Sequence, residues 1–142
     1  MTPVQEHNLP TRIESVDDAA LSAEQFARAN GFGDDVVSAI DLAVRESVAN
    51  AVKHGNKFDE SKHVEVRFAK LEEGLEIQVR DFGAGFEIEE IPDPTDPANL
   101  LKANGRGILF MKSFMDEVEW EQASGGGMRV KMLKRVNPDQ AS

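Results

Sequence analysis

The segment that most restricts the fold of this chain lies between residues 34 and 54, where apolar side chains recur at helical spacing. Acidic residues at its start and Gly55 at its end are typical of helix boundaries. At 100° per residue, the arc that predicts the core face contains Val36, Val37, Ile40, Val44, Ser47, Val48 and Ala51. Glu46 and Asn50 lie on a flank of this helix, next to Ala39, Leu42 and Ala43.

The remaining apolar patterns predict one further long helix and several strands. Ser15 is a plausible N-cap for a helix that Gly31 ends. Alternating residues predict strands over about 4–9, 64–68, 75–79, 118–120 and 128–136, and a short helix follows Gly107. The order is strand, two helices, hairpin, loop, helix, hairpin. It predicts an α+β fold: a two-layer α/β sandwich with a mostly antiparallel sheet and helices on one face.

The chain has 142 residues, which predicts a single domain over 1–142. Residues 87–107 contain three prolines and many acidic residues, so we expect a lid there. Residues 137–142 are expected to form a frayed tail.

The sequence has no cysteine, which excludes a disulfide framework and fits a cytoplasmic protein. Neither a membrane-spanning run nor a signal peptide is present. The net charge of −10 argues against direct nucleic-acid binding.

The first polar block lies on the helix of residues 34–54. Glu46 and Asn50 are four residues apart, so their side chains point the same way. A carboxylate can act as a general base, and an amide oxygen can ligate Mg²⁺. Lys53 and His54 extend the same ridge towards possible phosphate contacts. Taken alone, these residues also fit an ordinary solvated helix surface.

The second block is Asp81-Phe-Gly83-Ala-Gly85-Phe86, at the end of an alternating strand. Glycine allows a flat ring to approach the backbone, and a carboxylate at such a turn can accept a hydrogen bond from the exocyclic amine of adenine. The same composition also fits a plain turn.

The third block is Gly105-Arg106-Gly107, just before the short helix. Backbone N–H groups at a helix start, approached through Gly105 and Gly107, can bind phosphate, and Arg106 adds a positive charge. A loop that happens to end in this tripeptide is the alternative. No P-loop motif and no strand-linked G-x-G-x-x-G motif is present.

The order and spacing of the three blocks resemble the GHKL ATPases: Glu46-x-x-x-Asn50 resembles their N box, and the other two blocks resemble their glycine boxes. Glu46-Ser-Val-Ala-Asn50-Ala-Val-Lys-His-Gly55 is more closely similar to the RsbW/SpoIIAB-like anti-sigma regulatory serine/threonine kinases. The resemblance spans about residues 9–134 and implies a Bergerat fold, the histidine-kinase-like ATPase fold. The segment 87–104 has no residue-by-residue match.

The resemblance implies ATP and Mg²⁺ as cofactors and assigns roles to the residues of the three blocks. Glu46 would be the catalytic base, and Asn50 would ligate Mg²⁺ and contact ATP. The remaining cofactor-binding residues would be Lys53, Asp81, Gly83, Gly85, Gly105, Arg106 and Gly107. The implied partners are a STAS-domain anti-sigma antagonist as substrate, a sigma factor and a second copy of the chain in a homodimer.

Two other interpretations stay open at the level of sequence. A nucleotide-binding regulator could switch partners without phosphorylating them, although it would have no need of Glu46. A histidine-kinase-type catalytic domain is disfavoured, because none of the three histidines lies in a long dimerisation helix.

Overall fold

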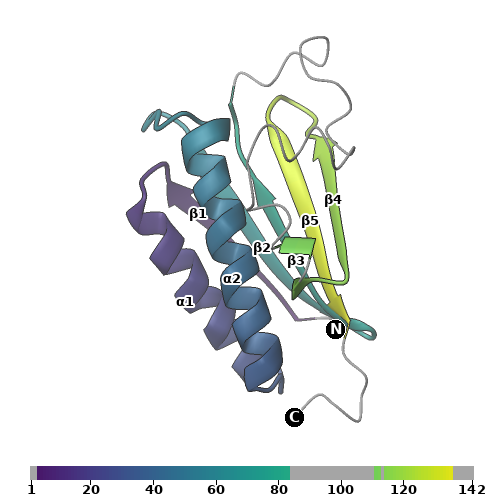
Figure 1. Ribbon diagram of the computed structural model, residues 1–142. Coiled ribbons are helices and arrows are strands. Elements are labelled where there is room, and N and C mark those ends of the chain that lie inside the picture. Colours follow the sequence, from purple (N-terminus) through teal and green to yellow (C-terminus); the bar gives the residue numbers. More distant parts are fainter. Residues whose placement is uncertain (1–2, 84–110, 113, 136–142) are drawn as a thin grey trace.

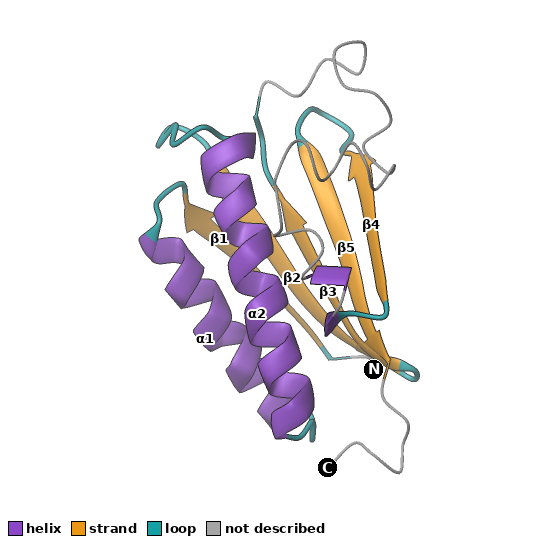
Figure 2. Ribbon diagram, viewed as in Figure 1, coloured by secondary structure: helices purple, strands orange, loops and turns teal. Residues whose placement is uncertain are grey.

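The computed structural model describes residues 3–83, 111–112 and 114–135, and Figure 1 shows their arrangement. A five-stranded sheet has the order β1-β2-β3-β5-β4, with every neighbouring pair antiparallel. Its strands are β1 (Val4–Pro10), β2 (His63–Leu71), β3 (Gly74–Arg80), β4 (Glu117–Gln122) and β5 (Met128–Arg135). The helices α1 (Glu14–Ala29) and α2 (Asp34–Asn50) cover one face of the sheet (Figure 2). The predicted α+β sandwich is therefore confirmed.

The core lies between this sheet and the two helices. Strand residues that alternate in the sequence point into it, so that Val66 pairs with Val79, and Ile77 pairs with Met132, in neighbouring strands. All four of these side chains are buried. In α2 and the residue that follows it, every member of the predicted core face is buried: Val36, Val37, Ile40, Val44, Ser47, Val48 and Ala51. The helical periodicity thus identified the correct face.

The start of α1 differs from the prediction. The helix begins at Glu14, the N-cap position is Ile13, and no side chain caps it. Ser15 lies inside the first turn, where its buried hydroxyl donates a hydrogen bond to the carbonyl of Pro10 at 2.7 Å. The prediction of Ser15 as N-cap was therefore wrong. Its hydroxyl instead attaches the helix start to the end of β1.

The end of α2 also differs from a regular helix. The predicted helical extent to about His54 is confirmed, but Ala51–Gly55 form a π-helical turn, η1. The backbone N–H of Asn56 donates to the carbonyl of Ala51 at 2.7 Å, one residue further back than in an α-helix. Because this turn is wider than an α-helical one, Gly55 and Asn56 lie at different positions relative to the sheet than they would after a regular α-helix.

The predicted short helix after Gly107 lies mostly outside the described residues. Met111, Lys112 and Phe114 are helical, and the buried side chains of Met111 and Met115 belong to the core. The predicted lid at 87–107 and tail at 137–142 lie outside the described residues. No helix in the described part of the chain is long and apolar enough to cross a membrane.

Candidate nucleotide-binding site

Glu46 and Asn50 lie half-buried on the last turns of α2. Neither side chain has a hydrogen bond or an ion pair with any described residue. Asp41 and Arg45 of the same helix are paired: Arg45 Nε lies 3.1 Å from Asp41 Oδ2, and Arg45 Nη1 lies 2.6 Å from Asp17 Oδ1. The carboxylate of Glu46 and the amide of Asn50 thus remain available to a ligand.

Lys53 and His54 lie on the π-helical turn η1, and both are exposed. They too have no ion pair within the described part of the chain. Lys53 therefore adds an unpaired positive charge next to the end of α2. Such an exposed charge is better suited to binding an anionic ligand than to a structural role in the core.

Asp81 follows the last residue of β3 and is buried, with 8% of its surface exposed. Its Oδ1 accepts hydrogen bonds from the backbone N–H groups of Gly83, at 3.0 Å, and Met128, at 3.2 Å. The backbone N–H of Asp81 itself donates to the carbonyl of Met128 at 3.0 Å. No described residue donates a hydrogen bond to Oδ2. The carboxylate is therefore held firmly through one oxygen, and the other is free to accept.

Burial raises the pKa of the Asp81 carboxyl group above its usual value, because removal from water penalises the charged form. The two backbone hydrogen bonds to Oδ1, and the positive charges of Arg80 and Lys62, oppose this shift only partly. A buried acid with a perturbed pKa at a strand end is typical of a binding site rather than of an ordinary turn.

Glycine at positions 55 and 83 allows the end of η1 to touch this turn. A Cβ atom added to Gly55 would collide with the carboxylate of Asp81, and one added to Gly83 would collide with the carbonyl of Gly55. The helix that carries Glu46 and Asn50 therefore ends directly against the acid. Asn50 lies five residues before Gly55, at the start of the π-helical turn that leads to the acid.

The structure thus brings together two of the three predicted blocks. Gly85, Gly105, Arg106 and Gly107 lie outside the described residues. The roles assigned to them stay predictions.

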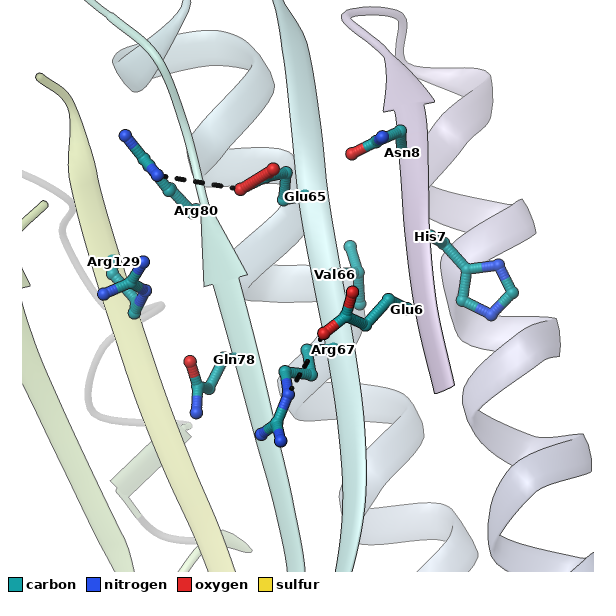
Figure 3. Close-up of a pocket in the computed structure, with 9 residues that line it drawn as sticks. All are labelled: Glu6, His7, Asn8, Glu65, Val66, Arg67, Gln78, Arg80 and Arg129. Carbon is teal, nitrogen blue, oxygen red and sulfur yellow. Dashed lines mark ion pairs between the residues drawn. The ribbon is translucent and has the colours of Figure 1, made fainter. Parts of the chain in front are cut away.

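The helix-free face of the sheet carries a separate, open hollow of about 370 Å³ (Figure 3). Its charges are compensated: Arg67 Nε lies 3.4 Å from Glu6 Oε1, and Arg80 Nη1 lies 3.8 Å from Glu65 Oε1. None of the predicted site residues lines it. This hollow is therefore not the candidate site.

Residues 9–134 match the model of a protein family described as the histidine kinase-like ATPase domain. The chain belongs to this family. The predicted GHKL resemblance is therefore confirmed over nearly the whole chain.

Several relatives of this ATPase-family chain share the name serine-protein kinase RsbW. The protein of Bacillus licheniformis is 32% identical over 92% of this chain and 84% of its own length. That of Bacillus subtilis strain 168 is 30% identical over 95% and 87%. That of Listeria monocytogenes serovar 1/2a is 29% identical over 93% and 87%. The chain is thus an ATP-binding kinase of the RsbW type.

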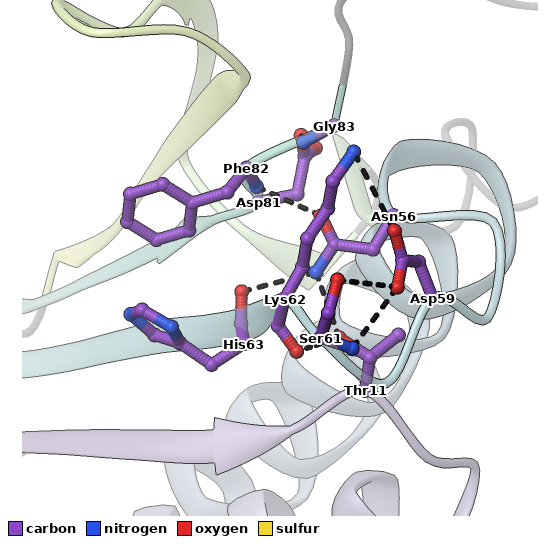
Figure 4. Close-up of polar contacts among 9 residues, drawn as sticks. All are labelled: Thr11, Asn56, Asp59, Ser61, Lys62, His63, Asp81, Phe82 and Gly83. Atoms are coloured by element: carbon purple, nitrogen blue, oxygen red, sulfur yellow. Dashed lines mark hydrogen bonds and ion pairs between the residues drawn. The ribbon is translucent and has the colours of Figure 1, made fainter.

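Three contributors to the Asp81 environment of this RsbW-type kinase were not predicted from the sequence. Met128 supplies a backbone N–H from a strand 47 residues away. Gly55 was predicted as a helix end, not as a neighbour of the acid. Asn56, which is 2% exposed, binds the backbone of Phe82 (Figure 4). Asn after Gly at a helix end is typical of a plain turn, so no local signal distinguished it.

Proposed function

We propose that this chain is an ATP-dependent serine/threonine protein kinase and anti-sigma factor. In this role it phosphorylates a STAS-type anti-sigma antagonist and sequesters a sigma factor. The observation that carries the proposal is the contact between Gly55 and Asp81, which places the unpartnered polar end of α2 against a buried acid with one free oxygen. The relatives named serine-protein kinase RsbW support the choice of a hydroxyl as acceptor.

Asp81 is assigned to the adenine base. Its free Oδ2 suits the exocyclic amine of adenine as a hydrogen-bond donor, whereas the 6-oxo group of guanine would be repelled. Gly83 allows the backbone of this turn to lie against the carbonyl of Gly55 and is assigned to the same base-binding site. Gly85 is assigned to this site on the family pattern.

Asn50 is assigned to Mg²⁺. This cation is usually held by one or two protein oxygens together with substrate phosphates and water. The half-buried amide of Asn50, which has no partner among the described residues, fits that donor set. Bound Mg²⁺ would neutralise charge on the phosphate oxygens.

Glu46 is assigned as the general base. It lies one helical turn before Asn50, and its carboxylate has no ion pair with a described residue. It accepts the proton of the acceptor hydroxyl while that oxygen attacks the γ-phosphorus and ADP leaves. Lys53 is assigned to phosphate oxygens, as are Gly105, Arg106 and Gly107 at the far end of the proposed lid.

The proposed partners follow from the family pattern. They are the STAS-domain antagonist, the sigma factor and a second copy of the chain in a homodimer. A protein that holds a sigma factor acts in the cytoplasm, so we place this chain there.

The test is incubation of the chain with Mg²⁺, γ-labelled ATP and the STAS-domain protein encoded near its gene. We expect label on a serine or threonine of the STAS protein, identified by phosphopeptide mapping. Nucleotide binding without any transfer would contradict the kinase assignment and favour a regulator that only switches partners. Label on a histidine would favour a histidine-kinase-type domain.

A further inference from the structure

Asn56 connects four separate segments of the chain next to the proposed adenine site (Figure 4). Its side-chain Nδ2 donates to the hydroxyl of Thr11 at 2.9 Å and to the carbonyl of His63 at 3.0 Å. Its Oδ1 accepts from the backbone N–H of Phe82 at 2.8 Å. Asn56 itself directly follows η1. One buried amide therefore joins the ends of β1, η1 and β3 to the start of β2.

The orientation of this amide follows from its neighbours. The buried hydroxyl of Thr11 already donates to the carbonyl of Lys62 at 2.7 Å, so towards Asn56 it can only accept. The carbonyl of His63 is also an acceptor. Both N–H groups of Asn56 are thereby committed, and its oxygen must face the N–H of Phe82. The arrangement leaves the amide a single orientation.

The bond to Phe82 acts on Asp81, because it holds the peptide group that joins these two residues. On the other side, the backbone N–H of Asp81 is held by Met128 at 3.0 Å. The Asp81 main chain is thus fixed both before and after its Cα atom. Loss of the Asn56 bond would leave the partly buried N–H of Phe82 without that acceptor and free the turn to shift.

We propose that Asn56 is a positioning residue for recognition of the nucleotide base: it holds Asp81 so that Oδ2 meets the amino group of adenine. This inference rests on the proposed role of Asp81. Because a misplaced carboxylate distinguishes an amino group from an oxo group poorly, Asn56 supports the preference for adenine over guanine nucleotides. A merely structural role would affect stability and leave that preference unchanged.

The test compares the dissociation constants of ADP and GDP, by calorimetry, for the wild type and Asn56→Ala. We expect ADP binding to weaken about tenfold, as for one lost hydrogen bond, and GDP binding to change little, so that the GDP dissociation constant divided by the ADP dissociation constant falls by the same factor. Asn30→Ala is the matched control, because it removes a side-chain amide bond of 2.8 Å to the carbonyl of Phe26, at the end of α1. It should lower the melting temperature and leave the ratio unchanged.

An Asn56→Ala protein with the wild-type ratio of GDP to ADP dissociation constants would overturn the proposal. If that variant fails to fold, Thr11→Val replaces it: it keeps the side-chain shape but removes the hydroxyl that orients Asn56. We then expect a fall in the ratio of about threefold, and an unchanged ratio would overturn the proposal.

The Asp81→Asn variant distinguishes a failure of this proposal from a failure of the proposed function on which it rests. If Asp81→Asn abolishes the adenine preference but Asn56→Ala does not, only the positioning role is wrong. If Asp81→Asn leaves the preference intact, both assignments are wrong.

Discussion

Gly55 and Asp81 approach so closely that a single added methyl group at position 55 would overlap the carboxylate. The two residues come from different parts of the fold, since Gly55 ends η1 and Asp81 follows β3. Their contact fixes the distance between the polar end of α2 and the buried acid. It is therefore the relationship on which the proposed nucleotide site depends.

Gly55→Ala tests this contact. We expect it to lower the free energy of unfolding by about 1–3 kcal/mol, as overpacking of a filled site does, and to weaken ADP binding because Asp81 is displaced. Calorimetry and urea unfolding measure the two effects.

Gly31→Ala is the control for that experiment. Gly31 has a φ of +88°, and an added Cβ would meet no atom within 4 Å. The change should cost about 1 kcal/mol through backbone strain and leave ADP binding intact. Equal ADP affinity in both variants would contradict the account.

Asp81→Asn should abolish most nucleotide binding without loss of stability. The amide keeps an oxygen for the N–H groups of Gly83 and Met128 but removes the buried charge. Loss of a hydrogen bond to a charged group corresponds to roughly 10- to 100-fold weaker ADP binding. A variant that binds ADP like the wild type would exclude Asp81 from the base site.

The difference in stability between the wild type and Asp81→Asn should also depend on pH. Burial raises the pKa of Asp81 in the folded state, so over the interval between its usual and raised values the folded protein binds more protons than the unfolded chain. Wild-type stability from this group therefore decreases as pH rises through that interval, from about pH 4 upward.

Asn at position 81 does not titrate, so the stability advantage of the variant should grow over this interval and then stay constant. Urea unfolding of both proteins across a pH series measures it. A stability difference that is independent of pH would show that the carboxyl group is not perturbed as described.

Much of the fold follows from periodicity, whereas the environment of Asp81 does not. The buried arc of α2 and the alternation in β2 and β3 are local patterns, so the sequence predicted the core face and the strands. Asn56 bonds to Thr11 and Phe82, which lie 45 and 26 positions away in the sequence. Only the assembled sheet brings these partners together. Likewise, the π-helical turn at Ala51–Gly55 is not distinguishable from an α-helix by apolar spacing.

Asn50→Ala tests the proposed metal ligand. We expect ADP binding in the absence of Mg²⁺ to stay close to the wild-type value, because Asp81 is untouched. The increase in affinity that Mg²⁺ gives the wild type should be lost. Calorimetric titrations with Mg²⁺ and with a chelator measure both values. Retention of the full Mg²⁺-dependent increase would remove Asn50 from this role.

The most direct test of the account is phosphotransfer by Glu46→Gln at saturating ATP and Mg²⁺, with the STAS-domain protein as acceptor. The amide keeps the size of the side chain but cannot accept the hydroxyl proton, so the rate should fall about 10²–10⁴-fold while ADP affinity stays unchanged. Glu24→Gln, which alters a half-buried acid of α1 paired with Arg28, is the matched control and should transfer phosphate at the wild-type rate. A wild-type rate from Glu46→Gln would contradict the assignment of the catalytic base.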